Sequence, residues 1–293
     1  RVVTETGKEV ICTYNQPFLT KDGWKRADEI LFGTPIRVMP KIPTMVKKLV
    51  PTNFAAVERK SGLLKEVSVP EKFTPELASL CGYIIGDGHI HKRGYSITCY
   101  VNNEETDLIE KLSGLWNKTF DVKPSIYVKN VNGSVRTIDD GSGLLRQIIS
   151  TQQLHVLDIN SRQVAQSLSF LSNKRVPQQI FKSPKQVIAS FISWLFDADG
   201  CVIARNRYGS RYLNIRFAKQ SKILLERIKG ELVGILGKMP KIKDMKTYYI
   251  FEFGAGTDKA FSLYDYLYRG KTLYLSRKKD IFETFLRHKG VLV

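Results

Sequence analysis

The sequence predicts an α+β fold in which one α-β-β-α-β-β-α unit occurs twice about a pseudo-twofold axis, behind a small β-rich module. Two apolar segments, LCGYIIGDG at residues 80–88 and ISWLFDADG at 192–200, both end in a small residue, Asp and Gly. After each segment comes a stretch of alternating apolar and polar residues, the period-two pattern of a half-buried strand. Two similar units in one chain indicate two half-sites that share a central two-helix interface.

The chain divides into five segments by composition and pattern. Short strands and turns rich in Thr, Gly and Pro come first, a charged stretch follows, and the duplicated part occupies the rest. We expect a β-rich module at residues 1–50, a linker at 51–72, a first half at 73–152, a connector at 153–182 and a second half at 183–293.

The first unit begins with a helix. Thr74 supplies a capping hydroxyl and Pro75 occupies the first helical position, so we expect a helix from here to Asp87. Residues 95–102 alternate apolar and polar side chains, which predicts a strand. Downstream we expect a helix at 104–118, a hairpin over 125–139 that turns at Asn132-Gly133, and a helix at 142–152.

The second unit repeats this order. Ser183 and Pro184 open a helix in the same way, and the helix runs to Asp199. Residues 211–218 alternate as a second half-buried strand. We then expect helices at 220–236 and 257–268, and a strand pair within 241–253. The repeat extends to LSNKR at 171–175 and LSRKK at 275–279, each well beyond its own motif.

The composition indicates a globular protein that binds a polyanion. Lys and Arg number 46 against 28 Asp and Glu, a net charge of +18, and such a surface attracts nucleic acid. No apolar run approaches the roughly 18 residues that span a membrane, and the N-terminus lacks the pattern of a signal peptide. Four cysteines in mostly apolar surroundings are typical of reduced thiols in an intracellular protein. Because the first residue is Arg1, we expect a chain excised from a longer one.

The polar faces of the predicted strands carry residues that read DNA. Alternate side chains of a strand share one face of its sheet, and Arg, Asn, Ser and Thr bind phosphates and base edges. A two-stranded ribbon also fits the major groove; an ordinary solvated sheet face is the alternative. The candidates, with Arg205, Arg207 and Arg211 in or beside a turn, are Lys92, Arg93, Ser96, Thr98, Tyr100, Lys129, Arg136, Arg205, Arg207, Arg211, Tyr212, Asn214, Arg216, Lys241 and Lys243.

The two helix-end carboxylates predict a metal site. Helices packed with their C-terminal ends together would bring Asp87 and Asp199 close, and adjacent carboxylates repel unless a cation lies between them. Hard divalent ions such as Mg²⁺ or Mn²⁺ take oxygen ligands, activate water and stabilise a leaving oxyanion. Lys174 and Lys278 are candidate catalytic residues that offset charge on the phosphate in the transition state; surface cations are the alternative.

These segments resemble a known family. The two helix motifs look like those of LAGLIDADG homing endonucleases in the two-motif, single-chain form, over roughly residues 74–285. The sequence KRVP at 174–177, leading to FDADG, is similar to the family's approach to its second motif. The resemblance implies one four-stranded saddle per half, each straddling double-stranded DNA. It also implies staggered cleavage of a long asymmetric site, and we expect the internally duplicated chain to act as a monomer.

The resemblance also implies roles for individual residues. In the family, the final Asp of each motif binds metal with help from the preceding backbone carbonyl. The implied metal ligands are Asp87 with Gly86 and Asp199 with Ala198, and the implied phosphate lysines are Lys174 and Lys278. One departure concerns the helix interface, where Gly82 corresponds to Trp194 although the family favours small residues. We therefore expect asymmetric helix packing, or a Trp194 side chain that turns away.

Residues 13–24, TYNQPFLTKDGW, resemble a segment of intein splicing domains. That segment normally reads T-x-x-H before Pro-Phe, and Gln16 stands here in place of the His that assists the first acyl shift. The chain closes with Gly-Val-Leu-Val rather than His-Asn. We therefore expect a partial intein module that does not splice; an unrelated small β module is the alternative.

The leading hypothesis is a site-specific, Mg²⁺-dependent endonuclease of double-stranded DNA. A second hypothesis keeps the fold without cleavage, as an RNA maturase or a DNA-binding regulator, and a degenerate protein-splicing intein is the third. His89 and His91 form an H-x-H beside the first Asp. Without a further Cys or His cluster we expect them in a turn or against DNA rather than in a separate metal site.

Overall fold

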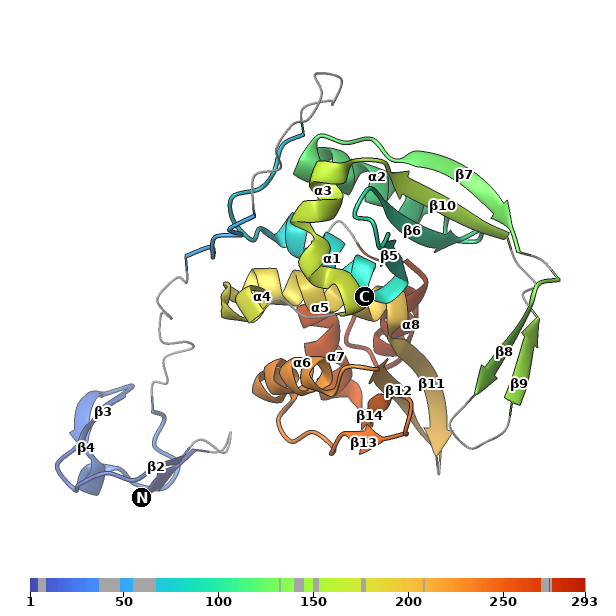
Figure 1. The fold of residues 1–293 in the computed structure, drawn as a ribbon. Helices are drawn as coiled ribbons and strands as arrows, with labels where there is room; N and C mark the ends of the chain where they lie inside the picture. The colour runs from blue at the N-terminus through green and yellow to red at the C-terminus, as the bar shows by residue number, and fades with distance from the viewer. Residues whose placement is uncertain are drawn as a thin grey trace. The chain divides into compact units, whose positions relative to one another are not determined.

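The structure, a computed structural model, forms two compact units, Arg1–Lys47 and Lys48–Val293 (Figure 1). It describes residues 1–4, 9–36, 48–54, 67–131, 133–139, 145–149, 153–174, 178–207, 209–269, 274 and 276–292. The first unit contains the pairs β1 (Val2–Val3) with β2 (Glu9–Val10) and β3 (Pro17–Thr20) with β4 (Gly23–Arg26), followed by η1 (Ala27–Glu29). These short strands agree with a β-rich module, and its resemblance to an intein stays a prediction.

The second unit contains two copies of one arrangement of helices and strands. The first copy is α1 (Pro75–Asp87), β5 (Gly88–Ile90), β6 (Ile97–Asn102), α2 (Thr106–Phe120), β7 (Ser125–Asn130), β10 (Gln153–Ile159) and α3 (Arg162–Ser167). The second copy is α5 (Lys185–Asp199), β11 (Cys201–Arg207), β12 (Ser210–Lys219), α6 (Lys222–Leu236), β13 (Lys243–Asp244), β14 (Tyr249–Ala255) and α7 (Thr257–Leu267). The predicted α+β duplication is confirmed.

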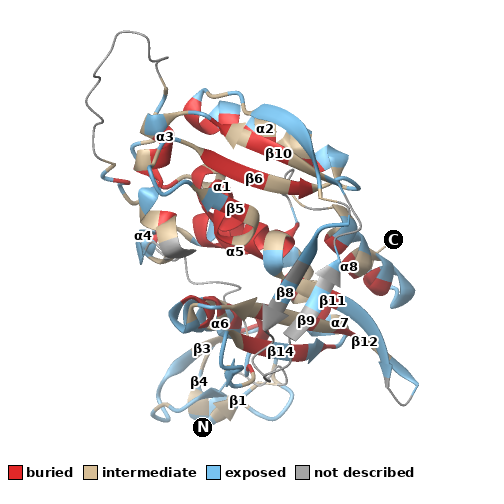
Figure 2. Cartoon of the chain, turned by 45° about the vertical axis from the view of Figure 1, so that its right-hand side comes forward, coloured by how far each residue is buried: buried red, intermediate tan, exposed pale blue. Residues whose placement is uncertain are grey.

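Each copy has one four-stranded antiparallel sheet, and the strands follow the same order in both. The orders are β5-β6-β10-β7 and β11-β12-β14-β13. Ile97 and Cys99 of β6, like Leu213 and Ile215 of β12, are fully buried, and Figure 2 shows β6 as a mostly buried strand. The predicted apolar alternation is therefore confirmed, and it leaves the opposite face of each sheet for polar side chains.

The central helices α1 and α5 pack side by side between the sheets (Figures 1 and 2). Gly82 permits this contact, because a Cβ there would lie 2.4 Å from the carbonyl oxygen of Phe191. Trp194, which corresponds to Gly82, is buried and meets the ring of Tyr83 edge-on, with centroids 5.7 Å apart. The interface is therefore asymmetric, as predicted from this departure.

The hairpin expected over 125–139 is wrong. β7 pairs with β10, whereas β8 (Val135–Asp139) pairs with β9 (Leu145–Ile149) in a separate ribbon. β9 also occupies the segment for which we expected a helix, so that expectation is wrong among the described residues. Both errors have one cause: β-strand pairing depends on burial and cross-strand neighbours, which a local turn signal does not encode.

We expected the first half to end at residue 152, but this boundary would separate β10 from the other strands of the first sheet. β10 begins at Gln153, inside the predicted connector, and pairs with both β6 and β7. The described residues of this unit also form the helices η2 (Ser169–Lys174), α4 (Gln178–Lys182) and α8 (Ser276–His288). None of the helices in the described part of the chain is long and apolar enough to cross a membrane.

Candidate active site

The Asp residues of the two motifs end the central helices, and both helices end in the same way. The backbone N–H of Gly88 donates to the carbonyl of Ile84. The N–H of Gly200 donates to the carbonyl of Phe196 at 2.7 Å. A Cβ on Gly88 would lie 2.5 Å from the Ile84 Cα, and one on Gly200 would lie 2.1 Å from the Phe196 ring. Glycine therefore lets the chain pass close to the last turn of the helix at both tips, which explains the shared Asp-Gly ending.

The two helix tips touch at small residues. A Cβ on Gly86 would lie 2.2 Å from the Cβ of Ala198 and 3.7 Å from the backbone nitrogen of Asp199. The peptide that carries Asp87 therefore lies beside the peptide that carries Asp199. Two carboxylates at one such contact favour a bound cation. Gly86 and Ala198 form this contact, and the role of their carbonyls as metal ligands stays a prediction.

A lysine from the second sheet reaches the Asp199 tip. Lys219, the last residue of β12, forms an ion pair with Asp199, and only 10% of the lysine side chain is exposed. Burial lowers the pKa of Lys219, while the carboxylates of Asp199 and Asp87 act in the opposite direction. The cavity beside the pair is lined by Ile85, Gly86, Asp199, Ala218, Lys219, Gln220, Ser221, Leu224 and Tyr248. Both motif carboxylates thus act on one mostly buried ammonium.

The ladder registers show which residues of the two sheets are equivalent. His89 and Cys201 each stand two residues after a motif Asp, and they pair with Thr98 and Arg216 respectively. The offset between β6 and β12 is therefore 216 − 98 = 118 residues. Because 219 − 118 = 101, the first-half residue equivalent to Lys219 is Val101, which is buried. The first half has an apolar side chain where the second has an ammonium.

Sequence reasoning missed Lys219, although the sequence holds a signal for it. Leu213, Ile215 and Phe217 form the apolar series of β12, and Lys219 continues that series at the next alternate position. A charged group on the core side of a strand is costly unless it is paired. A lysine at this place therefore indicates a carboxylate partner near the end of the strand.

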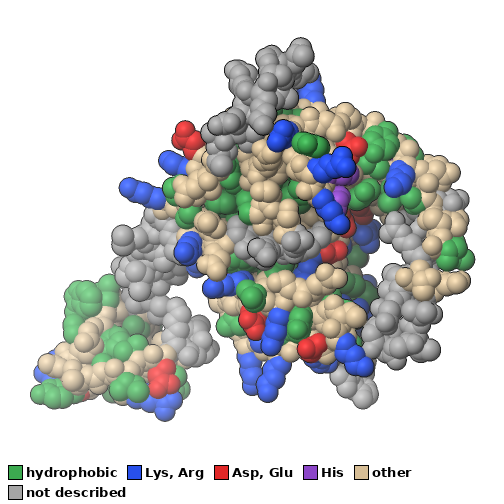
Figure 3. All heavy atoms as spheres, in the orientation of Figure 1, with side chains coloured by type: hydrophobic (Ala, Val, Ile, Leu, Met, Phe, Trp, Pro, Cys, Tyr) green, Lys and Arg blue, Asp and Glu red, His purple; other side chains and the backbone are tan. Residues whose placement is uncertain are grey.

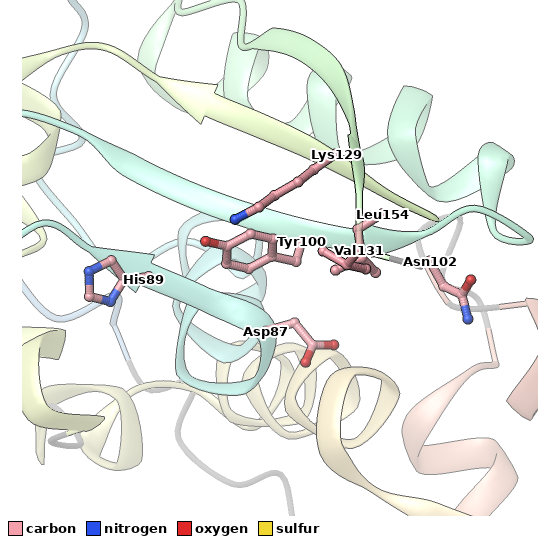
Figure 4. Close-up of a pocket in the computed structure, with 7 residues that line it drawn as sticks. All are labelled: Asp87, His89, Tyr100, Asn102, Lys129, Val131 and Leu154. Carbon is pink, nitrogen blue, oxygen red and sulfur yellow. The ribbon is translucent and has the colours of Figure 1, made fainter. Parts of the chain in front are cut away.

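The first-half tip opens onto a different cavity. Asp87 lines it together with His89, Tyr100, Asn102, Lys129, Val131 and Leu154 (Figure 4). Figure 4 shows Lys129 extending toward the Tyr100 ring, and β7, which carries this lysine, is an edge strand. Three predicted site residues, Asp87, Tyr100 and Lys129, thus meet in one cavity, and the lysine on this side is exposed.

Lys278 lies buried against the last turn of α5, and its role beside a phosphate stays a prediction. Its side chain is buried, and Nζ donates to the carbonyl oxygens of Phe196 at 2.8 Å and Asp197 at 2.6 Å. Burial lowers the pKa of Lys278, and the nearby Asp197 carboxylate acts in the opposite direction. Asp197 also accepts a hydrogen bond from the Tyr268 hydroxyl at 2.8 Å. The lysine therefore satisfies carbonyls in the last turn of α5, directly behind Asp199.

Most predicted DNA-binding residues lie on the accessible face or in the turns of the sheets. Figure 3 shows Lys and Arg side chains spread over the visible face of the second unit. Exposed or half-exposed are Lys92, Arg93, Ser96, Tyr100, Lys129, Arg205, Arg211, Tyr212, Asn214, Arg216, Lys241 and Lys243. Arg205 lies within β11, opposite Tyr212, and not in a turn. The side chains of Arg136, Lys174 and Arg207 lie outside the described residues, and DNA contact by the whole set stays a prediction.

Thr98 is the exception among these candidates. It is 4% exposed, its hydroxyl donates to Oδ1 of Asp158 at 2.6 Å, and Nε2 of His91 lies 3.2 Å from the same hydroxyl. A buried hydroxyl with this bond cannot reach a base edge, so the expectation for Thr98 is wrong. Its two hydrogen-bonding partners, His91 and Asp158, lie against the Thr98 hydroxyl.

The donor set at the tips fits a hard divalent cation. Across the described ranges, no three His, Cys, Asp or Glu side chains form a metal-binding group. His89 and His91 pack edge to face with ring centroids 5.2 Å apart, without a third ligand of this kind among the described residues. Two carboxylates with adjacent backbone carbonyls match an ion that keeps waters and phosphate oxygens as its other ligands.

Comparison with known families gives one match over most of the chain. The profile of the family described as LAGLIDADG-like domain matches residues 74–168 and 186–288. Each matched segment begins at or close to one of the central helices and contains one Asp tip. The two segments together cover more than half of the 293 residues.

Curated relatives match over a small part of their own length. The glutamine–fructose-6-phosphate aminotransferase (isomerizing) of Methanocaldococcus jannaschii is 27% identical over 178 residues, covering 60% of this chain and 14% of the relative. The tRNA-splicing ligase RtcB of Pyrococcus furiosus is 23% identical over 240 residues, covering 77% and 24%. The replicative DNA helicase DnaB of Synechocystis sp. is 26% identical over 249 residues, covering 82% and 24%. The chain spans about a quarter or less of each relative.

Two solved structures are similar at low sequence identity. A mesophilic variant of the homing endonuclease I-DmoI has 14% identity and a TM-score of 0.41, covering 67% of this chain and 96% of that chain. The N-terminal LAGLIDADG domain of DUF199/WhiA has 13% identity and a TM-score of 0.43, covering 70% and 86%.

Proposed function

Because the chain belongs to the LAGLIDADG-like domain family, we propose that it is a site-specific endonuclease of double-stranded DNA. It hydrolyses phosphodiesters with a divalent cation, Mg²⁺ or Mn²⁺, and leaves staggered ends. The observation that carries this proposal is the contact of Gly86 with Ala198, which sets the two motif aspartates at one junction. The fold of this family supports a homing endonuclease or a related nucleic-acid binder.

The chain's own residues have distinct parts in this proposal. Asp87 and Asp199 would hold the cation, together with the carbonyls of Gly86 and Ala198. A cation there supplies Lewis acidity, which lowers the pKa of a water and stabilises a leaving oxygen. Lys219 orients Asp199 through their ion pair and keeps positive charge where the phosphodiester would approach. Such fixed charge favours a transition state more negative than the substrate.

The charge of the chain supports DNA as the substrate. A net charge of +18 favours a polyanion, and phosphate contacts release counterions, so binding should weaken steeply with salt. The target site is asymmetric in this proposal, because equivalent positions of the two sheets differ. Thr98 of the first sheet corresponds to Arg216 of the second, and Val101 of the first corresponds to Lys219 of the second. Two unlike sheets read two unlike half-sites.

The relatives support an intein-encoded homing endonuclease. An aminotransferase, a ligase and a helicase share a segment similar to this chain over about a quarter or less of their lengths. One segment does not account for three different activities, which favours an inserted unit with its own activity. In this proposal the chain acts inside the cell as a monomer, and Gln16, in the place of the catalytic His, leaves its N-terminal module without splicing activity.

Cleavage of a randomised DNA library tests the proposal directly. The chain is incubated with the library and Mg²⁺, and the new ends are sequenced; we expect one family of cut sites with staggered ends. The double variant Asp87→Asn with Asp199→Asn should bind the selected site and leave it intact. Undiminished nicking by this variant would refute the assigned chemistry.

One observation favours a second candidate, a nucleic-acid binder without nuclease activity. The ammonium of Lys219 already neutralises Asp199, so the second tip carries a cation supplied by the protein. A binder of this kind would select one DNA or RNA sequence and produce no new ends at any Mg²⁺ or Mn²⁺ concentration. The library experiment therefore separates the two candidates by the presence of cut ends.

A further inference from the structure

One carboxylate lies at the same register position on the polar face of each sheet. Thr98 of β6 stands opposite Asp158 of β10, and Arg216 of β12 stands opposite Glu252 of β14. Because Thr98 and Arg216 are equivalent, Asp158 and Glu252 are equivalent as well. A carboxylate on a surface that faces phosphates repels them. We therefore expect a carboxylate on this face to serve mainly by holding another side chain in position.

Both oxygens of Glu252 are occupied by side chains of β12. Oε1 accepts a hydrogen bond from Nδ2 of Asn214. Oε2 accepts from Nε of Arg216 at 3.2 Å. This bond uses Nε, and within the described residues the two terminal amino groups of the guanidinium remain for another acceptor. The side chains of Arg216 and Glu252 are 41% and 37% exposed, so a ligand can reach that end of the arginine.

The neighbouring residues leave this cluster accessible. Gly254 lies opposite Asn214 and has no side chain to cover it, and a Cβ there would lie 3.3 Å from the Tyr212 ring. Tyr212 therefore rests against the backbone of β14 beside the cluster. The hollow at this place is lined by Ser210, Tyr212, Asn214, Lys243, Glu252, Phe253 and Gly254. Most of these lining side chains are polar.

Asp158, the equivalent carboxylate of the first sheet, accepts hydrogen bonds from hydroxyl groups and, among the described residues, not from an arginine. Oδ1 of Asp158 accepts from the Thr98 hydroxyl at 2.6 Å, and Oδ2 accepts from the Tyr127 hydroxyl at 2.9 Å. Thr98 is buried, and a hydroxyl offers one hydrogen. The two sheets thus share an acidic position, and in the second sheet this position holds an arginine toward solvent.

We propose that Arg216, held by Glu252, determines specificity in the second half-site by reading one guanine through its N7 and O6 atoms in the major groove. This inference rests on the proposed function in taking double-stranded DNA as the ligand. Guanine is the base that presents two acceptors side by side in that groove, and a forked arginine binds both. Glu252 is a positioning residue, because its two oxygens are already engaged by β12.

Selection by binding, without divalent metal, tests this inference. Wild-type protein and the variants Arg216→Lys, Glu252→Gln and Asp158→Asn are each used to capture duplexes from a randomised library, and the captured pools are sequenced. Wild type should prefer guanine at one position by about tenfold over other bases. Lysine keeps the charge and loses the fork, so Arg216→Lys should reduce this preference to about twofold. Glu252→Gln should do the same with no loss of total DNA binding, because it removes a negative charge.

The matched control is Asp158→Asn, which changes the equivalent carboxylate of the first sheet and should leave the guanine preference intact. Two results overturn the inference: a wild-type pool in which no guanine position responds to Arg216→Lys, or a Glu252→Gln pool that keeps the full preference. Because the readout is binding, a chain that selects this guanine and cuts no DNA refutes the proposed nuclease and supports the inference. A chain that captures no DNA in this metal-free selection overturns the inference, whereas cut ends in the library experiment with Mg²⁺ would still support the proposed nuclease.

Discussion

The Asp87 and Asp199 tips share their backbone and differ in the charges around them. Each tip ends a central helix, meets a glycine and continues into the first strand of a four-stranded sheet. Asp199 is paired with a mostly buried lysine from its own sheet and is backed by the buried ammonium of Lys278. Asp87 faces a cavity whose lysine, Lys129, is exposed. The duplication kept the geometry of the half-sites, and the electrostatics diverged.

This difference in charge predicts that the Asp87 tip and the Asp199 tip contribute unequally to one site. A mostly buried ion pair is less screened by salt and water than an exposed one, so the Asp199 side keeps a fixed positive charge. In the Asp87 cavity the positive charge is that of Lys129, an exposed residue of the edge strand β7. The following variants test first whether the tips act together and then how far they differ.

The largest expected effect tests whether the two tips form one site. Asp87→Asn and Asp199→Asn, made singly, preserve shape and remove one of two carboxylates. If the tips act as one site, either variant should slow cleavage of both strands by about a thousandfold or more, because several kcal/mol of transition-state stabilisation are lost. Single-turnover cleavage of a plasmid that carries the selected site measures both nicks. Loss on one strand alone in each variant would instead indicate two separate sites; Asp22→Asn, an exposed acid of the first unit, should cut at the wild-type rate.

The second effect tests the asymmetry itself. Lys219→Met removes the ammonium beside Asp199, whereas Lys129→Met removes the one in the Asp87 cavity. We expect Lys219→Met to slow one strand by about a hundredfold and the other by less than about tenfold, because lost electrostatic stabilisation acts near the removed charge. Lys129→Met should show a weaker effect on the opposite strand, since its charge is solvated. Strand-resolved nicking rates measure both, and equal slowing of the two strands by Lys219→Met would contradict the difference between the tips.

The sequence predicts the shared backbone of the two halves better than their differences. Helix starts at Thr74 and Pro75, alternation along β6 and β12, and the Asp-Gly ends depend on local chemistry that each segment carries by itself. The pairing of β7 with β10 depends on a partner more than twenty residues away, and a turn signal at Asn132-Gly133 cannot report it. The sequence pattern therefore predicts a helix or strand reliably where the residues of that segment alone determine its structure, and less reliably where a distant partner strand does.

In the candidate site too, some residues could be predicted from the sequence and others could not. The motif aspartates follow from the repeat, and the small Gly86 follows from their close approach. The roles of lysines do not follow from spacing: Lys278 is buried against helix carbonyls, and Lys219 reaches Asp199 from a strand that sequence spacing alone treats as a DNA reader. A long flexible side chain can point several ways from one backbone position, so its partner becomes visible only in three dimensions.

The third effect concerns the support behind the Asp199 tip. Lys278→Met keeps the length of the side chain and removes the donor to the carbonyls of Phe196 and Asp197. We expect the free energy of unfolding to fall by about 2 kcal/mol, since buried acceptors lose their partner. Chemical denaturation measures it, with Arg277→Ala as the neighbouring control. Arg277 is 62% exposed in its ion pair with Glu105, so its loss should cost less than about 1 kcal/mol. Equal losses in the two variants would mean that Lys278 adds nothing beyond a surface pair.

The smallest effect concerns the packing of the two central helices at Gly82, whose counterpart in α5 is Trp194. Gly82→Ala puts a Cβ 2.4 Å from the carbonyl oxygen of Phe191, and backbone cannot yield there without moving α5. Helix propensity alone would make this change stabilising by up to about 1 kcal/mol, so any net loss measures the cost of separating the helices. We expect a net loss of about 1 kcal/mol in the free energy of unfolding, from overpacking. Gly114→Ala is the matched control, because it lies in α2 with nothing within 4 Å of the new Cβ and should gain stability. A gain in both variants would show that the helices have room to spare at Gly82, and the asymmetry with Trp194 would then have no energetic consequence.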